Sequence, residues 1–184
     1  MEIFAVLIVL IASMATSLGV GSSTLAIINF FVAIADGTID PAERRMMGNV
    51  YIVLRVAMVI LFFTITFETG YLAYHEGAAA FTPALWASWT VLAVLYINAI
   101  LMTLRIMPST FGPGIQAGSW YTLGGLAALA SVGVVIGNYL IFVLAYITFV
   151  TLVISVVNGI MAILKARKED KERALQVSSG GSIT

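Results

Sequence analysis

Four ionisable side chains lie within or beside the apolar stretches of this chain, and they are the groups with which it can do chemistry. The first is Arg55, which lies about 15 Å further along a helix than Arg45. That distance predicts a position deeper than a membrane boundary, where an arginine costs about 2.5–3.5 kcal/mol on insertion scales. Arg55 then either binds an anion or a carbonyl group in a cavity, or ties helices together. The candidate partners for the tying role are Asn29, Asn98 and Asn158.

The other three groups, Glu68, His75 and Glu76, follow Arg55 along the same predicted helix. Glu68 lies about 20 Å from Arg55 along the axis, so the two side chains do not pair within one helix. Two carboxylates and an imidazole this close in sequence can attract cations or relay protons at the outer face of the membrane. The alternative is a polar membrane interface that binds nothing.

Hydroxyl and amide side chains indicate where a pathway would run. Residues 17–24 contain two glycines and four hydroxyl residues, a poor centre for a helix. Either one long helix presents these small residues to a neighbouring helix, or two half-helices meet between Gly19 and Gly21 and expose backbone to a substrate, as in transporters. The predicted substrate pathway consists of Ser22, Ser23, Thr24, Asn29, Arg55 and Asn98.

The composition explains why these few polar groups matter. Apolar residues make up 61% of the 184 residues and charged residues 10%, whereas soluble domains carry about 25% charged residues. The predicted partner is therefore the lipid bilayer, and nucleic acid is not expected. The lack of cysteine and the single histidine exclude thiolate and two-histidine metal sites, so we expect no metal and no cofactor. No catalytic motif occurs in the sequence, and we expect no enzyme.

Five apolar stretches are predicted to position these groups as membrane-spanning helices. They cover residues 3–35, 46–69, 83–104, 119–136 and 139–164. Asp40, Pro41 and Glu43 predict a capping box at the start of the second helix. Glycine and proline predict that residues 106–118 form a loop. The fold class is therefore an all-α, polytopic membrane helix bundle over residues 1–164, followed by a charged helical extension and a flexible tail over residues 165–184.

Lysine and arginine positions predict the orientation of this bundle. Arg44, Arg45 and Arg105, and a cluster of five cations between residues 165 and 173, lie at alternate helix ends. Because loops rich in these residues stay in the cytoplasm, the 106–118 loop and the C-terminus are expected on the cytoplasmic side of the cell membrane. Residue 77 is expected on the opposite side.

The fourth stretch is the richest in small residues, and we expect it to pack most closely. Gly124 with Ala128, and Gly133 with Gly137, form two pairs that are each four residues apart. Small residues at this spacing let helix backbones approach. The partner face belongs either to a neighbouring helix or to a second copy of the chain.

Two functions from different classes fit this sequence. The first is a small channel or transporter for an ion or small solute, with its pathway between the helices. The second is a structural or accessory subunit that assembles with itself or with other membrane proteins and transports nothing. The scarcity of charges in the helices favours the second function, whereas the interrupted first stretch and Arg55 favour the first, which is the function we expect.

Overall fold

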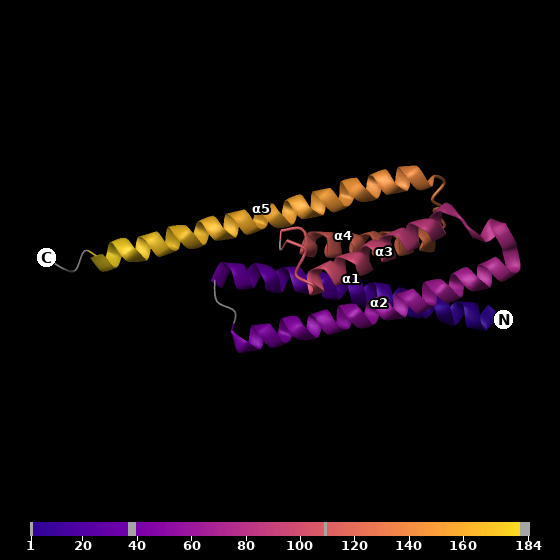
Figure 1. Ribbon diagram of the computed structural model, residues 1–184, viewed down its shortest axis with the longest axis horizontal. Coiled ribbons are helices and arrows are strands. Elements are labelled where there is room, and N and C mark those ends of the chain that lie inside the picture. The colour runs from indigo at the N-terminus through magenta and orange to yellow at the C-terminus, as the bar shows by residue number, and fades with distance from the viewer. Residues whose placement is uncertain (1, 37–39, 109, 181–184) are drawn as a thin grey trace.

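The computed structural model describes residues 2–36, 40–108 and 110–180, and its α-helices confirm the all-α class. The helices are α1 (Glu2–Asp36), α2 (Pro41–Glu76), α3 (Pro83–Thr103), α4 (Gly112–Ser131) and α5 (Tyr139–Gly180), with a short 3-10 helix, η1 (Gly77–Ala80), between α2 and α3. α5 is a single helix that continues past the bundle, as Figure 1 shows.

The first four helices form a ring, and α5 packs outside it. α1 packs against α2 and α4, and α3 also packs against both of these helices, which closes the ring. α5 lies against α4, α1 and α3. Figure 1 accordingly shows α3 and α4 between α5 on one side and the α1–α2 pair on the other. The interior of the ring is a hydrophobic core that includes Leu61, Leu92, Leu95 and Trp120.

Four helices among the described residues are long and apolar enough to cross a membrane, and α4 is not one of them. The first half of α4 is largely buried, including Gly112, Gln116 and Ser119. Because neighbouring helices rather than lipid cover these residues, α4 can carry small and polar side chains at membrane depth.

α1 continues without interruption through Gly19 and Gly21, so the structure excludes two half-helices in favour of one long helix. The packing around Gly19 explains why a glycine occupies this position. A Cβ atom on Gly19 would lie 2.1 Å from Cζ3 of Trp120 on α4, so only glycine lets that ring lie against α1. The capping box is also confirmed, with the Glu43 amide donating to the Asp40 side chain at 2.7 Å.

The predicted bounds of the fourth helix are wrong, because α4 begins at Gly112 and ends at Ser131. Glycine and proline in residues 112–118 suggested a loop, but Pro113 lies in the first turn, where proline is tolerated. Gly114 and Gly118 lie where α5 comes closest. A Cβ on Gly114 would be 2.9 Å from the Cα of Ile154, and one on Gly118 would be 3.3 Å from the Cα of Val150.

Of the two small-residue pairs predicted on the fourth stretch, only Gly124 of the first pair packs closely against another helix of the chain. Gly124 faces α1, since a Cβ there would lie 3.0 Å from Cγ2 of Val20. Ala128 is exposed. The pairing of Gly133 with Gly137 is wrong, because both follow the end of α4 and nothing lies within 4 Å of a Cβ at either residue. Gly133 instead ends α4 in a left-handed conformation, with a φ of 73°.

α3 ends in the same way as α4, but with arginine in the left-handed position. The Ile106 amide donates to the Leu101 carbonyl at 3.0 Å, and the Arg105 amide donates to the Met102 carbonyl at 3.1 Å. This pattern is a Schellman motif, in which the left-handed residue is usually glycine. Arg105 has a φ of 57° and therefore carries the steric cost that glycine avoids.

Replacing Arg105 by glycine is expected to stabilise the bundle by about 1 kcal/mol, because the left-handed conformation then carries no Cβ penalty. The converse change, Gly133→Ala, should destabilise it by about the same amount, since its φ of 73° also lies in the left-handed region. Unfolding of the purified protein in detergent measures both. Equal stability of Arg105→Gly and the parent chain would contradict this account.

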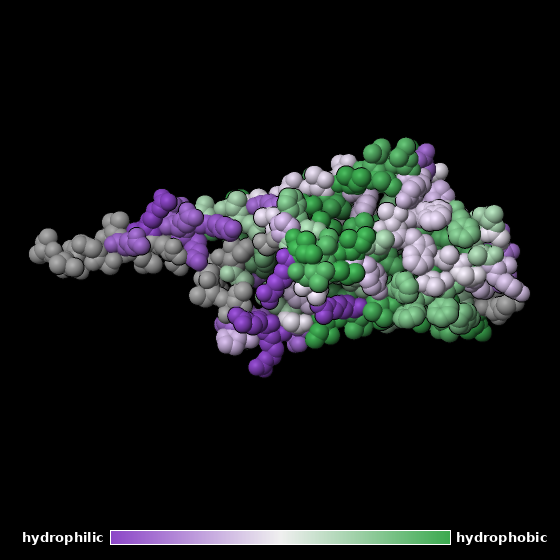
Figure 2. Space-filling view, viewed as in Figure 1, coloured by the Kyte–Doolittle hydropathy of each residue, from purple (hydrophilic) through white to green (hydrophobic). Residues whose placement is uncertain are grey.

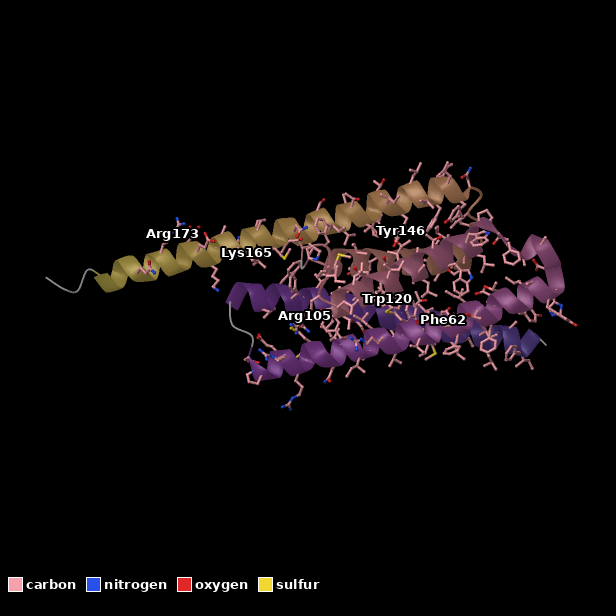
Figure 3. The ribbon with its side chains drawn as sticks, in the orientation of Figure 1. Phe62, Arg105, Trp120, Tyr146, Lys165 and Arg173 are labelled. Atoms are coloured by element: carbon pink, nitrogen blue, oxygen red, sulfur yellow. The ribbon has the colours of Figure 1, made fainter. Side chains whose placement is uncertain are left out.

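Charged side chains gather at one end of the bundle, the end from which α5 extends, and the middle is hydrophobic (Figure 2). We call this end the basic end. Arg105 and Lys165 lie toward it in Figure 3. The opposite end, where α2 is followed by η1 and carries Glu68 and Glu76, is called the acidic end.

Candidate functional site

α3 serves as a measure of depth, because its 21 residues span about 31 Å, close to the thickness of a bilayer core. Nη2 of Arg55 lies 3.5 Å from Oγ1 of Thr103, the last residue of α3. Arg55 is therefore level with the basic end of α3 and is exposed there. The predicted depth counted residues from Arg45, but the first turns of α2 extend beyond the end of α3, so Arg55 lies near the end of that helix.

Glu68 lies deeper than its sequence position near the end of an apolar stretch suggested. Its neighbour Thr69 accepts a hydrogen bond of 3.0 Å from Nε1 of Trp89. Trp89 lies about 9 Å along α3 from Pro83. Glu68, which is partly buried, therefore lies level with the first turns of α3 rather than beyond its end. A carboxyl group at that depth is a functional candidate.

A cavity of about 410 Å³ lies within the acidic-end half of the ring, and Glu68 lines it. Its walls come from α1, α2, α3, α4 and the segment that follows α4. We call it the acidic-end cavity. Its polar lining residues are Ser13, Thr16, Glu68, Thr82, Ser88 and Ser131, and the floor nearest the middle of the bundle includes Leu61 and Leu123. Glu68 is the charged residue in this lining.

A second cavity, of about 260 Å³, lies between α2 and α3 in the other half of the molecule. We call it the basic-end cavity. Arg55, Tyr51 and Thr103 line it together with Gln116 of α4. On α2 its lining reaches Met58, whereas the acidic-end cavity reaches Leu61, about 5 Å further along the helix. The two cavities thus approach each other from opposite ends.

Buried side chains lie between the two cavities, and we call them the apolar layer. Between the nearest lining residues this layer spans about 5 Å on α2, about 10 Å on α4 and about 16 Å on α3. It consists of Met58, Leu61, Leu92, Leu95, Ala117 and Trp120, each at most 4% exposed. Trp120 lies in the middle of the bundle in Figure 3. Its Nε1 has no hydrogen-bond partner among the described residues, although the side chain is completely buried. An unpaired buried donor is costly and marks a place where water or a ligand can bind.

Most of the predicted pathway residues face neighbouring helices instead. Asn98 is 2% exposed, and its Nδ2 donates to the Gly112 carbonyl and to Oε1 of Gln116, both at 3.0 Å. This pair ties α3 to α4. Thr24 pairs with the hydroxyl of Tyr121 on α4 at 2.9 Å. Of the predicted set, Arg55 lines the basic-end cavity.

The remaining predicted pathway residues lie on α1. Ser23 is buried and Ser22 is partly buried. Nδ2 of Asn29 is also buried and has no hydrogen-bond partner among the described residues. None of these three lines either of the two cavities. The structure therefore does not join them to Arg55 in one pathway.

The three predicted outer-face groups lie at the same end but not at one site. The ring of His75 lies 4.5 Å from that of Tyr71 and 5.1 Å from that of Tyr74, measured between centroids. His75 and Glu76 are exposed, whereas Glu68 lines the acidic-end cavity. Glu68 is thus separated from the other two.

The site residues that sequence reasoning missed are hydroxyls in unremarkable positions. Thr16, Ser88 and Ser131 are scattered over three helices and join only in the folded ring. Gln116 was placed in a loop, although it is buried between α3 and α4. The signal available in the sequence was the spacing of Gln116 and Ser119, which are three residues apart and therefore lie on one face of a helix. Comparison of the chain with family models, curated proteins and solved structures found no match.

Proposed function

We propose that this protein is a small membrane transporter that carries an ion or small solute between the acidic-end and basic-end cavities. The observation that carries this proposal is the apolar layer between two cavities that lie toward opposite ends of the bundle and each include polar lining residues. A transporter needs such a closed layer, because a pathway open to both sides would let solutes leak.

The apolar layer has features of a gate rather than of a uniform core. Trp120 lies in the layer and carries the unpaired Nε1 donor, while Gln116 borders the layer on the basic side. The contact between Gln116 and the layer is weak, with Nε2 lying 3.9 Å from Sδ of Met58. A small movement of α2 relative to α4 would exchange these contacts and join one cavity to the middle of the bundle.

The orientation is part of the proposal, with the basic end in the cytoplasm. The arginine that follows α3, the two arginines at the start of α2 and the five cations in the C-terminal part of α5 support this orientation, because such cations remain on the cytoplasmic side. The acidic-end cavity then opens to the outside.

Substituted-cysteine accessibility tests the proposal directly, because the chain has no cysteine. In sealed membranes, Ser88→Cys should react with an impermeant thiol reagent from outside only, and Thr103→Cys from the cytoplasm only. Leu95→Cys, in the apolar layer, should react slowly from both sides as the layer opens. Gly21→Cys is the matched control, because this exposed position on α1 faces lipid and should stay unreactive.

A structural or accessory subunit predicts a different pattern. Its apolar layer would stay closed, so Leu95→Cys would remain unreactive from both sides while the positions in the two cavities still labelled. Labelling of Ser88→Cys and Thr103→Cys from the same side would contradict the arrangement of two opposed cavities altogether.

A further inference from the structure

We propose that the acidic-end cavity binds a monovalent cation that oxygen atoms can coordinate, either an alkali-metal ion or a protonated primary amine. The inference deepens the proposed transport function by naming the class of ligand at one of its two cavities. The cation site depends on the proposed transport function in one respect only, because both require that water reaches this cavity.

Three of the five hydroxyl groups that line this cavity have already used their hydrogens. Oγ1 of Thr16 donates to the Ala12 carbonyl at 2.8 Å, and Oγ of Ser88 donates to the Ala84 carbonyl at 3.2 Å. Ser131 does the same toward the carbonyl of Ala128, at 2.7 Å. A hydroxyl that donates to its own helix offers only lone pairs to its surroundings. These three groups therefore present acceptors, which suit a cation and do not suit an anion.

Glu68 supplies the charge. Among the described residues, the Glu68 carboxylate makes no ion pair and no hydrogen bond, and no other charged side chain lines the cavity. The sequence has no lysine or arginine between residues 56 and 104 or between residues 106 and 164. All nine lysines and arginines therefore lie at or beyond the basic end, and none of them lies beside the half-buried carboxylate at the acidic end. Either a bound proton or an external cation must compensate that charge, and the hydroxyl acceptors around Glu68 favour the external cation.

The size of the cavity further restricts the class of ligand that it can bind. A volume of about 410 Å³ is large for a bare ion but falls within the range of small-molecule sites, about 300–1,000 Å³. A partly hydrated alkali ion or a small amine fits. A divalent ion is not favoured, since calcium and magnesium sites usually draw on several carboxylates or a bound phosphate and this cavity holds one carboxylate.

Cation-dependent thermal unfolding of the purified full-length protein tests the inference. Ionic strength is held constant with N-methylglucamine chloride, which is too bulky to coordinate, while sodium, potassium or methylammonium replaces it. We expect one of the three ions to raise the melting temperature in a saturable way. Sodium or potassium would identify an alkali-ion site, and methylammonium an amine site. Glu68→Gln should weaken the apparent affinity at least tenfold, whereas Glu76→Gln, which is exposed outside the cavity, should leave it unchanged.

Two further variants keep the test decisive if Glu68→Gln does not fold. Thr16→Val and Ser88→Ala each remove one oxygen ligand without changing the charge, and each should weaken the affinity severalfold. The inference is overturned if none of the three ions shifts the melting temperature, or if the shift survives in Glu68→Gln unchanged. Saturable binding together with an unreactive Leu95→Cys would retain the cation site and reject transport, so the two proposals fail separately.

Discussion

Replacing Gly19 by alanine is expected to destabilise the bundle by about 3 kcal/mol, the upper part of the usual range for overpacking. The added Cβ would lie 2.1 Å from Cζ3 of Trp120. Trp120 is completely buried in the apolar layer, so its ring has no space into which to move. The loss should appear even though alanine is the better helix former by about 1 kcal/mol.

Gly21→Ala is the matched control, because it makes the same change two residues away on the same helix. Nothing lies within 4 Å of a Cβ at Gly21, so this variant should be as stable as the parent or slightly more stable. Reversible unfolding in detergent and SDS measures both. A second site provides a rescue: in the Trp120→Leu background, the cost of Gly19→Ala should fall sharply, because the two residues are in contact. Equal costs for Gly19→Ala and Gly21→Ala would show that α1 and α4 do not meet at this glycine.

The second large effect is expected where α4 meets α5. Gly114→Ala should cost about 2 kcal/mol, because its Cβ would lie 2.9 Å from the Cα of Ile154, and a backbone atom cannot rotate away. Gly118→Ala should cost less, since the nearest contact is 3.1 Å, to Cγ2 of Val150, and a side chain can adjust. The expected order of damage is therefore Gly114, then Gly118.

Gly125→Ala on the same helix completes this series, because nothing lies within 4 Å of its Cβ and no loss is expected. Since α5 is held to α4 at these glycines, the Gly114→Ala variant should also expose the contact between Ser119 and Tyr146, whose hydroxyls lie 2.7 Å apart. Increased proteolysis of α5 in detergent would report its release. A stability order in which Gly125→Ala is the most damaging variant would disprove the assigned face of α4.

Several features of this protein follow from local sequence alone. A bilayer accepts only segments that satisfy their own backbone hydrogen bonds, so long uncharged stretches must be helices. The capping box at Asp40 is equally local, because all of its hydrogen bonds join residues at most three apart. The clustering of lysine and arginine in a few segments of the sequence likewise predicted that Arg44 and Arg105 lie at the same end of the bundle. These predictions depend on neighbours in the sequence and needed no tertiary information.

Tertiary structure decided which residues form the site, because depth and facing direction are set by neighbouring helices. Arg55 was predicted to be deep and Glu68 to be near the edge, but the pairings with α3 reverse this order, since α2 extends past the basic end of α3. The glycines Gly114 and Gly118 suggested a loop, but they lie in α4 and allow α5 to pack close to it. The acidic-end cavity joins side chains from four helices, and no local pattern marks Thr16 or Ser88 as its members, because their shared feature is a space that exists only when the ring closes.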